Sequence, residues 1–183
     1  MFLDLKFHDI PFTVEEAAYE AGRMGVWMFN VHAAGGTEMM KRALRGAERG
    51  AKEIGLPRPK VIAVTVLTSL SEADLAEAGF KENAEGLTLR LTRLALKAGL
   101  DGVVASPKEA AILRKELGSD FLIVSPGIRF EPAADDDQKR VSGPAEAVRA
   151  GSNYLVVGRP IRDAPDPVAA AKMIMQEINA EAG

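Results

Sequence analysis

The sequence predicts an α/β protein of the (β/α)8 TIM-barrel class, here a parallel βα array of about six strands. Short apolar runs alternate with longer helical patterns, which is typical of a parallel sheet. Small and polar residues follow each run, at the end of the sheet where such folds bind ligands. A doubly wound sheet fits the same strand count. Glycine and arginine after the last two runs favour the barrel, because barrels commonly hold phosphate there.

The expected strands are short runs rich in Val, Ile, Leu and Phe. They cover residues 2–6, 28–32, 60–66, 102–105, 121–124 and 154–157. No break in composition separates them, and a length of 183 residues is close to the usual size of one domain. The sequence therefore predicts a single domain over residues 1–183.

The expected helices follow the strands along the chain. They cover residues 14–23, 36–54, 72–78, 85–98, 108–117, 145–150 and 168–180. Thr13 and Glu16 have the spacing of a capping box at the start of the first helix, and Ser71 and Asp74 have it before the third. Residues 126–143 form the longest stretch without periodicity, and a loop of that length predicts a functional lid.

Composition excludes several classes of site and partner. The chain has no cysteine, so it has no disulfide, thiolate metal site or cysteine nucleophile, and its two histidines offer little to a metal. The formal charge is 23 − 26 = −3 without a basic tract, which argues against a nucleic-acid partner. No apolar run approaches the ~20 residues of a membrane span. Charges within residues 1–6 do not fit a signal peptide, so we expect a cytoplasmic protein.

The first expected strand carries an unusual set of charges. Because side chains alternate along a strand, Asp4 and Lys6 are expected on one face, pointing into the sheet interior. Such a pair is often only structural, since buried charges are costly unless they are paired. A third charge, Asp9, follows where the strand ends. Three charges of alternating sign favour a functional site, with His8 and His32 as polar residues near its rim.

The segment Asp4-Leu5-Lys6-Phe7-His8-Asp9-Ile10-Pro11, with Thr13, resembles the signature of the orotidine 5′-phosphate decarboxylase family, although Phe12 replaces its usual asparagine. Four further motifs recur in the family order: Asn30-Val31-His32-Ala33 with Gly35-Gly36, Val64-Thr65-Val66-Leu67-Thr68-Ser69, Pro126-Gly127-Ile128-Arg129 with Gln138, and Val157-Gly158-Arg159-Pro160-Ile161. The resemblance covers essentially the whole chain.

The resemblance implies decarboxylation of orotidine 5′-phosphate to UMP in pyrimidine synthesis, with no metal and no organic cofactor. Lys6 would protonate C6 of the pyrimidine, and Asp4 would hold Lys6 near the departing carboxylate. Residues matching Asp9 and Thr13 reach the neighbouring subunit's site in the family, which implies a homodimer.

The same resemblance assigns the substrate contacts. Thr68 and Ser69 would hydrogen-bond the pyrimidine, and Gly158 with Arg159 would bind the 5′-phosphate. Arg129 would stand at the start of the long loop. Gln138 within that loop would close on the phosphate.

The family barrel begins with two βα units before the strand that matches residues 2–6. Those units carry a ribose-binding aspartate and a lysine of the charge network, so we expect an N-terminally truncated barrel that is a poor decarboxylase. Two alternatives stay open. One is a Mg²⁺-dependent relative such as hexulose-phosphate synthase or ketogulonate-phosphate decarboxylase. The other is an inactive, nucleotide-binding barrel fragment.

Overall fold

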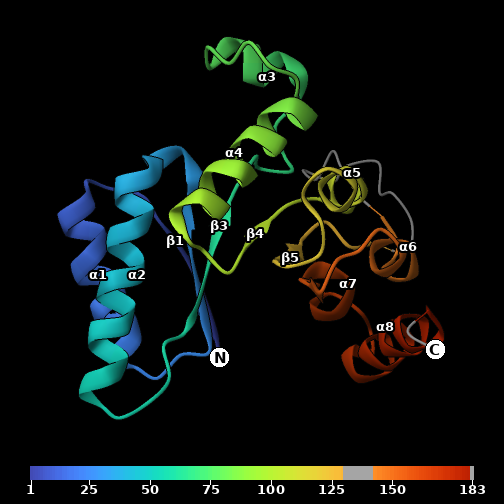
Figure 1. Ribbon diagram of the computed structural model, residues 1–183. Coiled ribbons are helices and arrows are strands. Elements are labelled where there is room, and N and C mark those ends of the chain that lie inside the picture. The colour runs from blue at the N-terminus through green and yellow to red at the C-terminus, as the bar shows by residue number, and fades with distance from the viewer. Residues whose placement is uncertain (130–141, 182–183) are drawn as a thin grey trace. The chain divides into compact units, whose positions relative to one another are not determined.

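The computed structural model describes residues 1–129 and 142–181, which form two compact units (Figure 1). Unit 1 consists of Met1–Thr65 and Leu87–Val104. Unit 2 consists of Val66–Gly86 and Ala105–Gly183.

Unit 1 is built on four parallel strands that neighbour one another in chain order. They are β1 (Phe2–Phe7), β2 (Met28–His32), β3 (Lys60–Val64) and β4 (Gly102–Val104). Its helical segments are α1 (Pro11–Arg23), η1 (Ala33–Gly35), α2 (Gly36–Glu53) and most of α4 (Ala84–Ala98). Met28, Phe29, Met39, Met40 and Ile62 are fully buried between strands and helices. Each such side chain contributes about 1.5–3 kcal/mol by leaving water.

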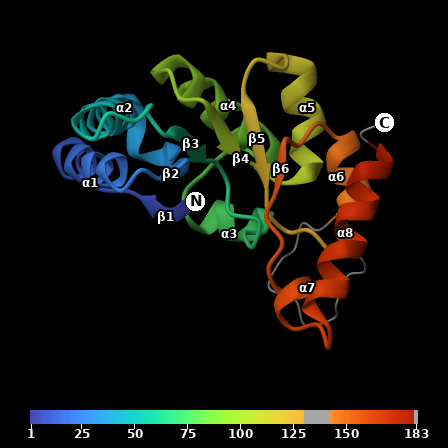
Figure 2. The same ribbon diagram turned by 90° about the horizontal axis from the view of Figure 1, so that it is seen from below.

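Helices α1 and α2 lie side by side against the β1–β3 strands (Figures 1 and 2). Gly46 and Gly50 of α2 allow the close approach, because a Cβ at either position would lie 2.0 Å from a carbonyl oxygen of α1. Glu15 is buried in this interface, where Arg42 Nη1 donates to its carboxylate at 2.6 Å. That hydrogen bond is the largest influence on the Glu15 pKa, which is lowered despite burial. The backbones of α1 and α2 are therefore in close contact, and a buried ion pair joins the two helices.

Unit 2 contains the parallel strands β5 (Leu122–Ser125) and β6 (Tyr154–Leu155). Its helices are α3 (Glu72–Glu77), α5 (Pro107–Leu117), α6 (Pro144–Arg149), α7 (Arg159–Arg162) and α8 (Pro167–Glu181). Ser71 caps α3 with Asp74 in a capping box, as the sequence predicts. None of the helices in the described parts of the chain is long and apolar enough to cross a membrane.

The expected strands and helices all form, and most of their ends move by one or two residues. The largest change among the helices is in α1, which begins at Pro11 instead of residue 14. Thr13 therefore lies inside the helix, and the predicted capping box with Glu16 is wrong. Pro11 explains the earlier start, because its fixed φ and missing N–H suit the first helical position. The short segments η1 and α7 were not expected from periodicity.

Substitution Gly46→Ala is expected to lower the free energy of unfolding by about 1–3 kcal/mol, because the new methyl group forces α1 and α2 apart. The helix propensity of alanine offsets about 1 kcal/mol of the cost at most. Urea denaturation measures the change. Gly86→Ala in α4 is the matched control, since its Cβ would meet only the side chains of Asn83 and Glu82. Equal stabilities of the two variants would contradict the close helix contact.

Candidate functional site

The candidate site in unit 1 is formed around an irregularity in β1. Leu3 pairs with Phe29 of β2 and Phe7 pairs with Val31, so the register shifts between these two pairs. Three residues of β1, Asp4, Leu5 and Lys6, therefore lie opposite the single residue Asn30. Such bulges redirect side chains and are common beside functional sites.

Lys6 has an unusual backbone within the bulge. Its φ of 54° is the only positive value at a non-glycine residue in the described parts of the chain. A left-handed conformation costs an ordinary L-residue roughly 1–2 kcal/mol. Lys6 N–H donates to Asn30 Oδ1 at 2.7 Å, so a side chain of β2 accepts a bond that a regular ladder would give to a carbonyl. The strained residue is thus fixed by its neighbour on the next strand.

Asp4, Lys6 and Asn30 form a closed set of three hydrogen bonds. Lys6 Nζ donates to Asp4 Oδ1 at 2.7 Å, and Asn30 Nδ2 donates to the same oxygen at 2.6 Å. Asn30 is only 1% exposed, whereas the Lys6 and Asp4 side chains are 39% and 44% exposed. The predicted pairing of Asp4 with Lys6 is therefore present. Neither side chain is buried in the sheet interior as expected, since both are more than a third exposed.

Asp9 and Thr13 lie where β1 passes into α1. The Asp9 carboxylate accepts the Ile10 N–H at 2.6 Å, and Thr13 is exposed in the first turn of α1. A cavity of about 290 Å³ connects this turn with the bulge. It is lined by Leu5, Lys6, Phe7, His8, Asp9, Thr13, Val14 and Ala17. Three predicted site residues, Lys6, Asp9 and Thr13, therefore share one hollow.

His8 and His32 stack next to this cavity. Their ring centroids are 5.3 Å apart, with His8 exposed and His32 half-buried at the end of β2. Burial lowers the pKa of His32, and the nearby His8 and Lys6 lower it further. A neutral His32 limits the positive charge close to Lys6. In residues 1–129 and 142–181, no three or more His, Asp or Glu side chains form a group that could hold a metal ion.

The predicted substrate contacts belong to unit 2. Thr68 is buried and Ser69 is half-buried in the turn before α3. Gly158 and Arg159 stand at the start of α7, and an added Cβ at Gly158 would meet no atom within 4 Å.

The long loop begins at a described residue and continues beyond the described part. Arg129 is half-buried, with its N–H donating to Ser142 O at 3.0 Å. Gln138 lies outside the described residues.

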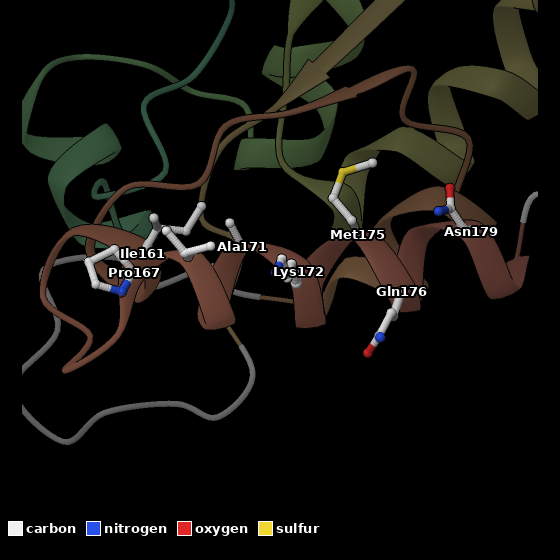
Figure 3. A pocket seen from close by; sticks show the side chains of 8 residues that line it. Ile161, Pro167, Ala171, Lys172, Met175, Gln176 and Asn179 are labelled. Carbon is white, nitrogen blue, oxygen red and sulfur yellow. The ribbon is translucent and has the colours of Figure 1, made fainter.

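A second hollow in unit 2 lies along α7 and α8, with a volume of about 560 Å³ (Figure 3). It is lined by Ile161, Pro167, Val168, Ala171, Lys172, Met175, Gln176 and Asn179. None of the predicted site residues lines it. Its largely apolar lining offers no charged group other than Lys172.

Asn30 is the residue of this site that sequence reasoning left without a role. It lies in the motif at residues 30–33, but strand periodicity gives an asparagine in an apolar run no function. A buried amide in the middle of a strand is itself a signal, because it needs hydrogen-bond partners. Its partners lie on a different strand, so the sequence around Asn30 does not identify them.

A family model and two known proteins similar to this chain all carry the same family name. A family model described as "Orotidine 5'-phosphate decarboxylase / HUMPS family" matches residues 1–174. A protein named orotidine 5'-phosphate decarboxylase from Geobacter metallireducens is 57% identical over 178 residues, covering 97% of this chain and 74% of that protein. A protein of the same name from Geobacter sulfurreducens is 57% identical over 180 residues, covering 98% and 74%.

A solved structure gives the same result for the fold. The crystal structure of orotidine 5'-phosphate decarboxylase from Lactobacillus acidophilus matches with a TM-score of 0.85 and 41% identity. The match covers 97% of this chain and 75% of that chain. It confirms the predicted α/β barrel class. The chain spans about three-quarters of the length of these relatives.

The imidazole of His32 is expected to titrate below its ordinary pKa of 6.5, because burial disfavours the charged ring. The unfolded chain then takes up this proton first, so folding stability falls as the pH drops from about 6.5 toward the folded-state pKa. NMR titration of the ring C–H resonances measures the pKa of His32 in the folded chain. The same ring in urea, titrating near 6.5, is the reference. A folded-state pKa at or above 6.5 would contradict the burial argument.

Proposed function

We propose that this chain, which belongs to the orotidine 5'-phosphate decarboxylase / HUMPS family, converts orotidine 5′-phosphate to UMP and carbon dioxide. The hydrogen-bonded Asp4–Lys6 pair at the carboxyl end of β1 carries the proposal. Lys6 lines the cavity of the site and Asp4 is hydrogen-bonded to it, so a substrate carboxylate bound there would meet the cation beside its carboxylate partner. Relatives 57% identical to this chain bear the decarboxylase name, which supports this substrate over the sugar phosphates of the Mg²⁺-dependent alternative.

The proposed reaction breaks the bond between C6 and the carboxylate carbon. Carbon dioxide leaves, and the electron pair of the bond stays on C6 as a carbanion. The Lys6 ammonium lies nearest this charge and transfers a proton to C6, and solvent restores the proton to Lys6. Preorganised charge of this kind is often the largest single contribution to catalysis. No metal or organic cofactor is needed to balance these steps.

Asp4 has two roles in this proposal. Its carboxylate holds the Lys6 ammonium at 2.7 Å, which fixes the direction of the proton. The same carboxylate would lie close to the carboxylate of the substrate, and departure of carbon dioxide removes that repulsion. The interaction is thus more favourable in the transition state than in the bound substrate, which is the requirement for catalysis.

The substrate contacts remain those assigned from the family motifs. We place the pyrimidine on Thr68 and Ser69 and the 5′-phosphate on Gly158 and Arg159. The guanidinium of arginine suits bidentate phosphate contacts. The open space at Gly158 supports a close approach to the backbone. Gln138 would close on the phosphate, and Arg129 would stand at the start of the loop that carries it.

We also propose a homodimer in which Asp9 and Thr13 face the partner's site. Both residues are exposed at the β1–α1 junction. Three large apolar side chains surround them and are also exposed: Leu5 at 60%, Ile10 at 66% and Phe12 at 66%. Apolar side chains gathered around polar functional residues favour a protein interface.

Lys6→Ala is expected to lower the rate of orotidine 5′-phosphate decarboxylation by about 10²–10⁴-fold, the usual effect of losing a proton donor. The loss of substrate absorbance measures the rate, with UMP titration showing that binding persists. Lys60→Ala is the control, since Lys60 begins β3 and pairs with Asp101. A Lys6→Ala variant that keeps a tenth of the parent rate would assign the proton to another group. A parent rate lost on chelation of divalent ions would favour the Mg²⁺-dependent alternative.

UMP is expected to bind more tightly than uridine, and Arg159→Ala should weaken UMP binding by about 10–100-fold while leaving uridine unchanged. A hydrogen bond to a charged group contributes about 1.5–3 kcal/mol, which corresponds to this range. Calorimetric titration measures both ligands. Arg162→Ala is the matched control three residues further along α7, where the guanidinium pairs with Asp163. Equal affinities for UMP and uridine in the parent would remove the phosphate assignment.

A further inference from the structure

We infer that Asn30 is a positioning residue for the proposed decarboxylation, acting through Lys6 and Asp4 together. This inference rests on the proposed function for its catalytic consequence. Its structural basis is independent of that function. One buried amide holds the backbone of the proton donor and the side chain of its carboxylate partner.

The amide of Asn30 fits these partners in only one orientation. Its oxygen accepts the Lys6 N–H at 2.7 Å, and its nitrogen donates to Asp4 Oδ1 at 2.6 Å. A reversed amide would set donor against donor and oxygen against carboxylate. The two contacts are therefore specific to an amide, because a carboxylate only accepts and an aliphatic side chain does neither.

The position of Asn30 places its amide within hydrogen-bond distance of both partners on β1. It lies on β2 opposite the bulge, where three residues of β1 share one partner residue. Lys6 holds a φ of 54° there, and its N–H bonds to the Asn30 side chain. The Asn30 side chain is only 1% exposed, so the surrounding packing holds it in one position. Its hydrogen bonds therefore hold the strained backbone at Lys6 in one position as well. The direction of Lys6 Nζ then depends on both Asn30 bonds.

Two substitutions separate the two bonds. Asn30→Leu keeps the branched shape of the side chain and removes both, whereas Asn30→Asp keeps the acceptor for Lys6 N–H and places a second carboxylate against Asp4. Thr92→Val in α4 is the matched control. It removes one buried hydrogen bond of unit 1, from Thr92 Oγ1 to Thr88 O at 2.8 Å, with no contact to the site.

The first readout is hydrogen exchange at the Lys6 amide, followed by NMR without any substrate. We expect exchange about tenfold faster in Asn30→Leu, the effect of losing one hydrogen bond. Asn30→Asp and Thr92→Val should exchange at the parent rate. Unchanged protection of Lys6 in Asn30→Leu would overturn the inference, whatever the substrate proves to be.

The second readout is the kinetic split on orotidine 5′-phosphate. Misplacement of a reacting group by ~1 Å can cost about 10²-fold in rate. We therefore expect kcat to fall by roughly that factor in Asn30→Leu and Asn30→Asp, with KM changing far less. Thr92→Val should keep the parent kcat. A parent kcat in either Asn30 variant, or a fall in KM alone, would overturn the positioning role.

The two readouts also separate this inference from the proposed function. A parent protein without decarboxylase activity refutes the function, while faster Lys6 exchange in Asn30→Leu still supports positioning. If Asn30→Leu does not fold, Asn30→Asp decides: a protected Lys6 amide is expected, and loss of that protection overturns the acceptor role of Asn30.

Discussion

The hydrogen bond from Lys6 N–H to Asn30 Oδ1 is the contact on which the geometry of the candidate site depends. β1 carries two more residues than β2 between their aligned pairs, so its backbone must leave the ladder. The unpaired N–H this creates would be costly if it stayed unsatisfied. Asn30 accepts it, and the same amide holds Asp4. The ammonium and carboxylate then meet at 2.7 Å, with both side chains partly exposed.

The rest of unit 1 keeps this arrangement rigid. Phe29 and Val31 flank Asn30 on β2 and are completely buried, so β2 cannot shift along its neighbours without exposing them. The glycines of α2 bring its backbone against α1, which directly follows β1 in the chain. Close packing of this kind transmits small displacements, since protein interiors have few voids to absorb them. The strained Lys6 is therefore supported by close packing of side chains and helices outside the site itself.

The charge balance around Lys6 follows from the same packing. His32 ends the strand that carries Asn30, and its half-buried ring favours the neutral form. Asp4 is thus paired with Lys6, and the neutral form of His32 adds no positive charge near that lysine. An arrangement with one hydrogen-bonded ion pair suits a reaction in which a carboxylate leaves and a carbanion is protonated.

Residue order by itself determined the order of strands and helices, because buried strands and amphipathic helices have distinct periods. It also indicated a functional site at Asp4, Lys6 and Asp9, because three charges of alternating sign are unusual in and directly after a strand. Tertiary structure decided the rest. The start of α1 at Pro11 overrode the Thr13–Glu16 pattern, and a bulge interrupts the regular strand on which simple alternation of Asp4 and Lys6 depends. Asn30 gained its role only when two strands paired, because its partners lie 24 and 26 residues away in the chain. No local pattern reports a contact between residues that only sheet pairing brings together.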